Sequence, residues 1–108
     1  MSTSLAILYS DEAIKDFGST LRKALRMEEI QDYASLIELE NAEKYEDFAE
    51  AIRKFLRRYE SHASRLHLRR PKEESLEKLM KLVSDYGVRL VRAALISHAL
   101  VKGIKEEE

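Results

Sequence analysis

Apolar residues recur at intervals of three and four along most of this 108-residue chain, and no segment shows sustained alternation of apolar and polar residues. That spacing gathers apolar side chains on one face of a helix, whereas a half-buried strand needs a period of two. Helix breakers are scarce, with 3 glycines and 1 proline. The pattern predicts an all-α fold, a compact bundle of four to five helices in a single domain over residues 1–105, with an acidic C-terminal tail at 106–108.

Helix-start signals place the first two helices. Ser10 is followed by two acidic residues, which is typical of a capped helix N-terminus, and the periodic run after it ends near Arg26. A second, shorter helix is expected over Glu28–Glu40. The apolar segment Leu5–Tyr9 either extends the first helix backward or forms a short separate turn.

The third periodic segment is the clearest in the chain and is expected to run from a boundary at Asn41, which suits a helix cap, to about Ser64. Phe55 lies at the margin of its apolar stripe, and both Tyr45 and Tyr59 are expected to pack in the core. This apolar stripe consists of Tyr45, Phe48, Ala49, Ile52, Leu56 and Tyr59. After the helix, a basic connector is expected over residues 65–70.

A long C-terminal helix is expected from Pro71, which suits a first helical turn, to Lys102, because Gly103 can end it. Its second half, Ala93–Val101, is apolar nearly all round, so this helix is expected to form the centre of the bundle. The sequence leaves open whether Ala93–Val101 is core or an interface with another subunit. Within it, His98 is expected to be a hydrogen-bonded core residue.

Charge is distributed unevenly, although the formal net charge is only −1. Residues 1–52 contain 5 Lys/Arg against 12 Asp/Glu, a net of −7, and residues 53–105 contain 14 against 5, a net of +9. An unbalanced basic segment attracts phosphate backbones, whereas the alternative is a solvated helix face neutralised by nearby acids. The candidate nucleic-acid-binding residues are Arg53, Lys54, Arg57, Arg58, Arg65, Arg69, Arg70 and Lys72.

No pattern typical of catalysis or metal binding occurs in the sequence. The chain has no cysteine, which excludes disulfides and Cys-ligated zinc, and His62 and His67 are five residues apart rather than the four that suit one metal on a helix. We therefore expect a non-enzyme without a cofactor or metal. The longest apolar run is about half of a membrane span and no secretory signal is visible, so a cytoplasmic protein is expected.

The segment Pro71–Val101 resembles the C-terminal helical part of the small subunit of archaeal type I-A CRISPR interference (Cascade) complexes. The similarity is greatest at Asp85, Tyr86 and Gly87, followed by a helix rich in Arg, Val, Ala and Leu. The resemblance implies a non-catalytic helical subunit, present in several copies, that contacts the target or displaced DNA strand through basic side chains. It also implies as partners the other subunits of the complex, neighbouring copies of the chain, DNA and guide RNA.

A second hypothesis is a helical protein–protein adaptor or oligomerising scaffold with no direct role on nucleic acid. In it, Ala93–Val101 docks a partner helix and the basic region meets an acidic surface, including that of a neighbouring copy. Salt-sensitive DNA binding distinguishes the two hypotheses, because only the first requires phosphate contacts. An enzyme is the third and most remote reading.

Overall fold

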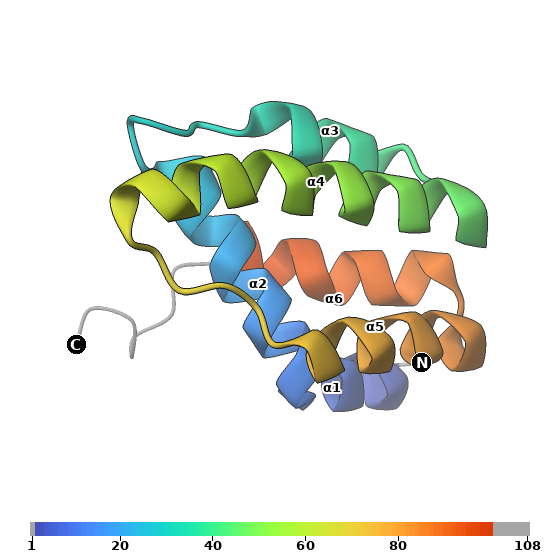
Figure 1. Ribbon diagram of the computed structural model, residues 1–108. Helices are drawn as coiled ribbons and strands as arrows, with labels where there is room; N and C mark the ends of the chain where they lie inside the picture. Colours follow the sequence, from blue (N-terminus) through green and yellow to red (C-terminus); the bar gives the residue numbers. More distant parts are fainter. Residues whose placement is uncertain (1, 101–108) are drawn as a thin grey trace.

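The computed structural model describes residues 2–100, which form six α-helices and no strand within that range (Figure 1). The radius of gyration of 13.0 Å is that of a compact domain of about 100 residues. The predicted all-α class is confirmed, with six helices in place of the expected four to five. The helices are α1 (Ser2–Ser10), α2 (Glu12–Arg26), α3 (Tyr33–Glu40), α4 (Tyr45–Leu66), α5 (Glu73–Tyr86) and α6 (Val88–Leu100).

Ser10 ends α1 and does not start α2, so the predicted start of this helix is one residue too early. The cap is Asp11, whose carboxylate accepts a hydrogen bond from the Ala13 N–H at 2.8 Å. Leu8 is completely buried, which anchors α1 to the core. The apolar segment Leu5–Tyr9 therefore belongs to a helix of its own.

The second predicted helix starts later than expected, because α3 begins at Tyr33 and not at Glu28. Gln31 has a positive φ of 43°, which lies outside the right-handed helical region. Asp32 then caps α3 by accepting hydrogen bonds from the N–H of Ser35 at 3.1 Å and from its hydroxyl at 2.6 Å. The residues between α2 and α3 therefore form a connection rather than a helix. The positive φ of Gln31 and the cap at Asp32 mark the end of this connection.

The buried face of α4 is rotated from the predicted apolar stripe. Phe55, expected at the margin, is 1% exposed, and Tyr59 is equally buried as predicted. The prediction that Tyr45 packs in the core is wrong, since its side chain is 44% exposed. α4 ends at Leu66, and its C-cap residue His67 has left-handed backbone angles, so Arg65 lies on the helix and not in the connector. Tyr45 is exposed because the predicted apolar stripe is wider than the face that α4 buries, so a side chain at the edge of the stripe remains at the surface.

The predicted single long C-terminal helix is wrong, because Gly87 divides it into α5 and α6. Gly87 has φ 95° and ψ 155°, a region open essentially to glycine alone, and its N–H still bonds the Val83 carbonyl at 2.8 Å. Pro71 precedes the first helical residue of α5 by two positions. The predicted helix end at Lys102 and Gly103, and the acidic tail at 106–108, lie outside the described residues.

α6 nevertheless lies at the centre of the bundle, as Figure 1 shows, packed against α2 and also against α1, α5 and α3. Gly18 of α2 permits this approach, because a Cβ there would overlap the side chain of His98. The half-buried His98 ring stacks on Tyr9, and its Nε2 lies 2.7 Å from the Tyr9 carbonyl oxygen. Leu95 is fully buried whereas Leu100 is 57% exposed. The described part of Ala93–Val101 is therefore core on its inner face and surface on its outer face.

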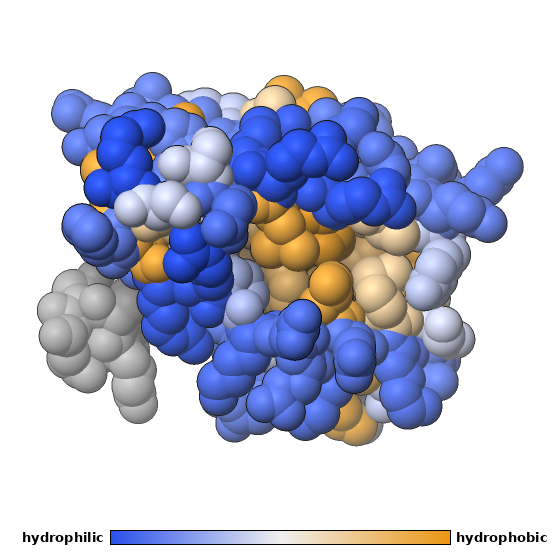
Figure 2. Space-filling model, in the orientation of Figure 1, coloured by the Kyte–Doolittle hydropathy of each residue, from blue (hydrophilic) through white to orange (hydrophobic). Residues whose placement is uncertain are grey.

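An apolar furrow between α4 and α5 is open on the face shown in Figure 2. On the two helices that border it, Leu56 of α4 and Leu76 and Met80 of α5 are apolar side chains that are neither fully buried nor fully exposed. All three apolar side chains are partly buried against the core. The core is thus incompletely covered on this face.

Candidate nucleic-acid interface

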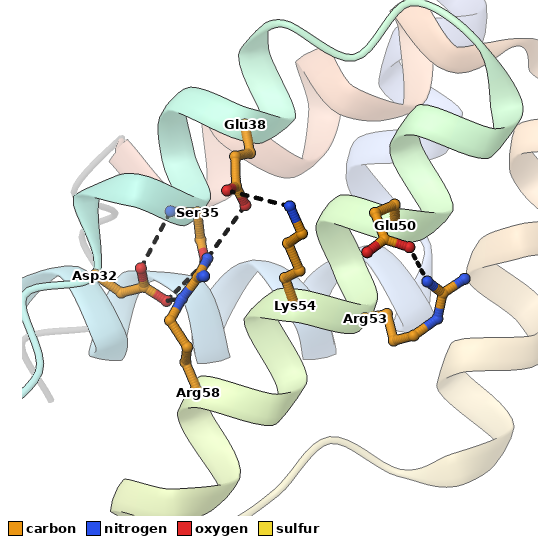
Figure 3. A network of polar contacts seen from close by, with 7 residues as sticks. All are labelled: Asp32, Ser35, Glu38, Glu50, Arg53, Lys54 and Arg58. Atoms are coloured by element: carbon orange, nitrogen blue, oxygen red, sulfur yellow. Dashed lines mark hydrogen bonds and ion pairs between the residues drawn. The ribbon is translucent and has the colours of Figure 1, made fainter.

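The eight predicted cations lie on two elements and do not form one patch. Five are on α4 and three are in the connector between α4 and α5, which crosses α2 in Figure 1. On α4 they point in different directions: Lys54 and Arg58 reach α3, while Arg53 lies on another side of the helix (Figure 3). The basic run that is continuous in sequence is therefore divided in space.

The guanidinium of Arg58 joins α4 to α3 (Figure 3). Its Nε lies 3.3 Å from the buried carboxylate of Asp32, and its Nη2 donates to the Ser35 hydroxyl at 2.6 Å. The same nitrogen lies 3.2 Å from Glu38, which is also 3.9 Å from Lys54. Partial burial lowers the pKa of Arg58, but the two carboxylates outweigh this and raise it. Arg58 is thus a structural cation that neutralises a buried acid.

Asp16 of α2 fastens the connector and α5 to the bundle. Its Oδ2 accepts hydrogen bonds from the N–H of Lys72 at 3.0 Å and from the Ser75 hydroxyl at 2.7 Å. Its Oδ1 lies 3.3 Å from Nη2 of Arg69. Burial raises the pKa of Asp16, but these hydrogen bonds and the charge of Arg69 more than offset burial and hold the pKa below its usual range. Asp16 therefore supplies from another helix the N-terminal cap that Lys72 cannot provide.

Two further predicted cations form ion pairs at the surface. Arg70 lies 2.6 Å from Glu60 and donates to the Ser64 hydroxyl at 2.9 Å. Arg53 pairs with Glu50 one turn earlier on α4 (Figure 3). The four charged side chains are each about half exposed, so these pairs contribute little to stability. An external anion can compete for Arg53 and Arg70, but only against a carboxylate already in place.

Three predicted cations have no carboxylate partner among residues 2–100. Arg57 and Lys72 are exposed, and the exposed Arg65 has its Nη2 3.2 Å from a ring nitrogen of His62. Nothing in the described part of the chain neutralises these charges. They are the members of the predicted set that remain available to an external anion.

Sequence reasoning missed the two acids that organise the site. Asp32 carried a local signal, because a good N-cap residue stands directly before the apolar run that begins at Tyr33. Asp16 carried none, since it is 56 residues from Lys72, with which it hydrogen-bonds. Long-range pairing of this kind has no periodicity to reveal it.

No group of three or more His, Cys, Asp or Glu side chains within residues 2–100 is arranged to hold a metal ion. Over the same span, no helix is both long enough and apolar enough to cross a membrane. The basic side chains are accordingly the features from which a functional site can be built.

Comparison with known proteins gives one informative similarity. No protein-family model matches the chain, and no solved structure matches it. An uncharacterized protein of Archaeoglobus fulgidus is 53% identical over 108 residues, covering 96% of this chain and 88% of that protein. Identity of this level over nearly the full length of both proteins implies common descent and a shared fold. The chain therefore belongs to the same family as the Archaeoglobus fulgidus protein.

Proposed function

We propose that the chain is a non-catalytic subunit of an RNA-guided CRISPR interference complex that contacts the phosphate backbone of the target or displaced DNA strand. The observation that carries the proposal is that Arg57, Arg65 and Lys72 are exposed without a carboxylate partner among the described residues. The resemblance of Pro71–Val101 to the small subunit of archaeal type I-A complexes is the reason for proposing this setting, an RNA-guided interference complex. The archaeal origin of the 53% identical relative is consistent with that setting.

The proposed contact is with backbone and not with base edges. Lysine and exposed arginine side chains bind phosphates as charges that carry no sequence information, while guide pairing supplies the sequence recognition in such complexes. Each neutralised phosphate releases condensed counterions, so affinity falls with salt in proportion to the number of contacts. In this role the chain binds, in a salt-dependent manner, a DNA strand whose sequence is recognised by the guide RNA.

The test removes the three unpaired cations together. The variant Arg57→Ala, Arg65→Ala, Lys72→Ala spares the Arg58 and Asp16 networks, so helicity should be retained. Its binding to single- and double-stranded DNA should weaken at low salt, with the slope of log affinity against log salt reduced by about 0.7 to 0.9 per lost contact.

The matched control removes three other exposed cations. The variant Lys23→Ala, Lys44→Ala, Arg89→Ala makes the same change in net charge on side chains outside the predicted set. If both variants change affinity and slope equally, binding follows net charge and the proposed site is wrong. If neither changes them, the backbone-contact function itself is refuted.

The apolar furrow between α4 and α5 favours a second candidate, the protein–protein adaptor. It is an alternative docking surface to Ala93–Val101, whose inner face is occupied by core packing, since Leu95 is 1% exposed. Met80→Glu places a charge on α5, one of the two helices that border the furrow, at a partly exposed position. For an adaptor, this variant should stay helical and lose co-purification with partner subunits from an archaeal host, while DNA binding stays unchanged. Unchanged co-purification would exclude the furrow as the docking surface.

A further inference from the structure

A cavity of about 390 Å³ lies between α2, the connector and the first turns of α5. Its lining is mainly polar and includes four basic side chains, of which Arg69 and Lys72 belong to the predicted set. Lys15 and Lys78 were not among the predicted binding residues. Asp16 and Ser75 also line the cavity.

Asp16 lines this cavity, and its side chain is 8% exposed. Both of its oxygens are engaged, one by the Lys72 N–H and the Ser75 hydroxyl and the other by Arg69. Since Arg69 neutralises its charge and its oxygens already accept hydrogen bonds, this carboxylate does not act as an open acceptor. It fixes the geometry of the cavity instead.

Each of the three lysines lies next to a residue anchored on that carboxylate. Lys15 precedes Asp16 on α2, Lys72 donates its own N–H to Asp16, and Lys78 lies one turn after Ser75 on α5. All three side chains are exposed, and none pairs with a carboxylate among residues 2–100. Their backbone positions are therefore fixed by one buried junction while their ammonium groups remain free, which reduces the ordering cost of binding.

We propose that this cavity binds a phosphate group, with Lys15, Lys72 and Lys78 as its charge contacts. Two exposed carboxylates, Glu12 and Glu74, share the lining and offset part of the positive charge. Free phosphate should accordingly bind weakly. A phosphate in a nucleic-acid chain should bind more tightly, because neighbouring phosphates of the same chain make further contacts with the protein. The inference that the ligand is a nucleic acid rests on the function proposed above.

The first experiment uses inorganic phosphate as the probe. Amide resonances of Ser19, Lys72 and Ser75 in ¹⁵N-labelled protein should shift and saturate with phosphate, but not with chloride at equal ionic strength. The variant Lys15→Ala, Lys78→Ala should weaken this binding by roughly tenfold, on the order expected for two lost charge contacts in a partly screened site. The control Lys23→Ala, Lys44→Ala should leave it unchanged.

The second experiment uses short oligothymidylate with the same two variants. Loss of Lys15 and Lys78 should reduce the salt slope by about 0.7 to 0.9 for each lysine, with helicity retained, and the control should not change it. Phosphate binding without any oligothymidylate binding would keep the cavity as an anion site and refute the nucleic-acid function. Oligothymidylate binding that is unaffected by the variant, together with no phosphate shifts, would refute the cavity and leave the proposed function standing.

Discussion

Asp16→Asn tests the junction that orders the connector and α5. The amide oxygen can still accept from both Lys72 and Ser75, but the side chain loses the charge that pairs with Arg69 and places its NH2 group against that guanidinium, donor facing donor. Hydrogen bonds to a charged acceptor contribute about 1.5 to 3 kcal/mol, and a helix cap contributes about 1 kcal/mol. Since these contributions overlap, we expect the free energy of unfolding to fall by about 2 to 3 kcal/mol.

The assay is thermal unfolding followed by circular dichroism at pH 7. For a domain of this size, 1 kcal/mol corresponds to about 4 to 8 °C, so Tm should fall by roughly 10 to 20 °C. Asp85→Asn is the matched control, because Asp85 pairs with Lys81 at 3.4 Å but both side chains are more than half exposed. That pair should contribute less than about 1 kcal/mol. Equal losses of Tm in the two variants would refute the reasoning about the buried junction.

The pH dependence of unfolding gives an independent check on the same carboxylate. The folded-state pKa of Asp16 is lowered, so its contribution is complete above the unfolded value of about 3.9 and is lost as pH falls through the folded pKa. Asn does not titrate. The difference in free energy of unfolding between the natural chain and Asp16→Asn should therefore be constant near pH 7 and become smaller below about pH 4. A difference that stays constant down to pH 3 would contradict the lowered pKa.

Three other substitutions test the fold. Arg58→Ala should lower the free energy of unfolding by about 1 to 3 kcal/mol in urea, because Asp32 and Ser35 lose a donor, while Arg57→Ala should change it by less than about 0.5 kcal/mol. Gly87→Ala should cost about 1 to 3 kcal/mol by the same assay, since φ is +95° and no side chain is near enough to compensate. Leu95→Asp should abolish helicity at 25 °C, because its side chain is 1% exposed; a folded variant would reopen this position as an interface.

The class of fold follows from periodicity, but the helix breaks do not. Gly87 stands inside a periodic run in which one glycine costs about 1 kcal/mol in a helix, so the sequence alone tolerates a continuous helix there. Packing α6 back against α2 and α1 requires the break at Gly87. The free energy gained from this packing depends on contacts between distant segments, so the local sequence pattern does not reveal it. The rotated face of α4 has a similar origin. Its stripe is wide enough for two orientations, and the packing partners select the one that buries Phe55 and leaves Tyr45 at the surface.

The candidate site was located only in part, because charge counted along a sequence differs from charge in space. The excess in residues 53–72 is +7, yet acids from outside this segment, on or next to α2, α3 and α4, fold against it. Four of the eight predicted cations thereby acquire carboxylate partners, and a fifth, Arg70, pairs with Glu60 inside the segment. The acidic first half of the chain neutralises the segment that the linear count presents as unbalanced.

This pairing sets an expected value for the salt dependence of DNA binding. Eight phosphate contacts would give a slope of about 5.6 to 7.2, taking 0.7 to 0.9 for each contact. The three unpaired cations, Arg57, Arg65 and Lys72, together with Lys15 and Lys78 of the cavity, would give about 3.5 to 4.5. We expect the lower range, because a paired cation must first release its carboxylate and the buried Asp16 and Asp32 would then be left without a counter-charge. A slope in the upper range would mean that binding rearranges the α3–α4 and α2–α5 junctions, and would contradict a preformed site built from the free cations.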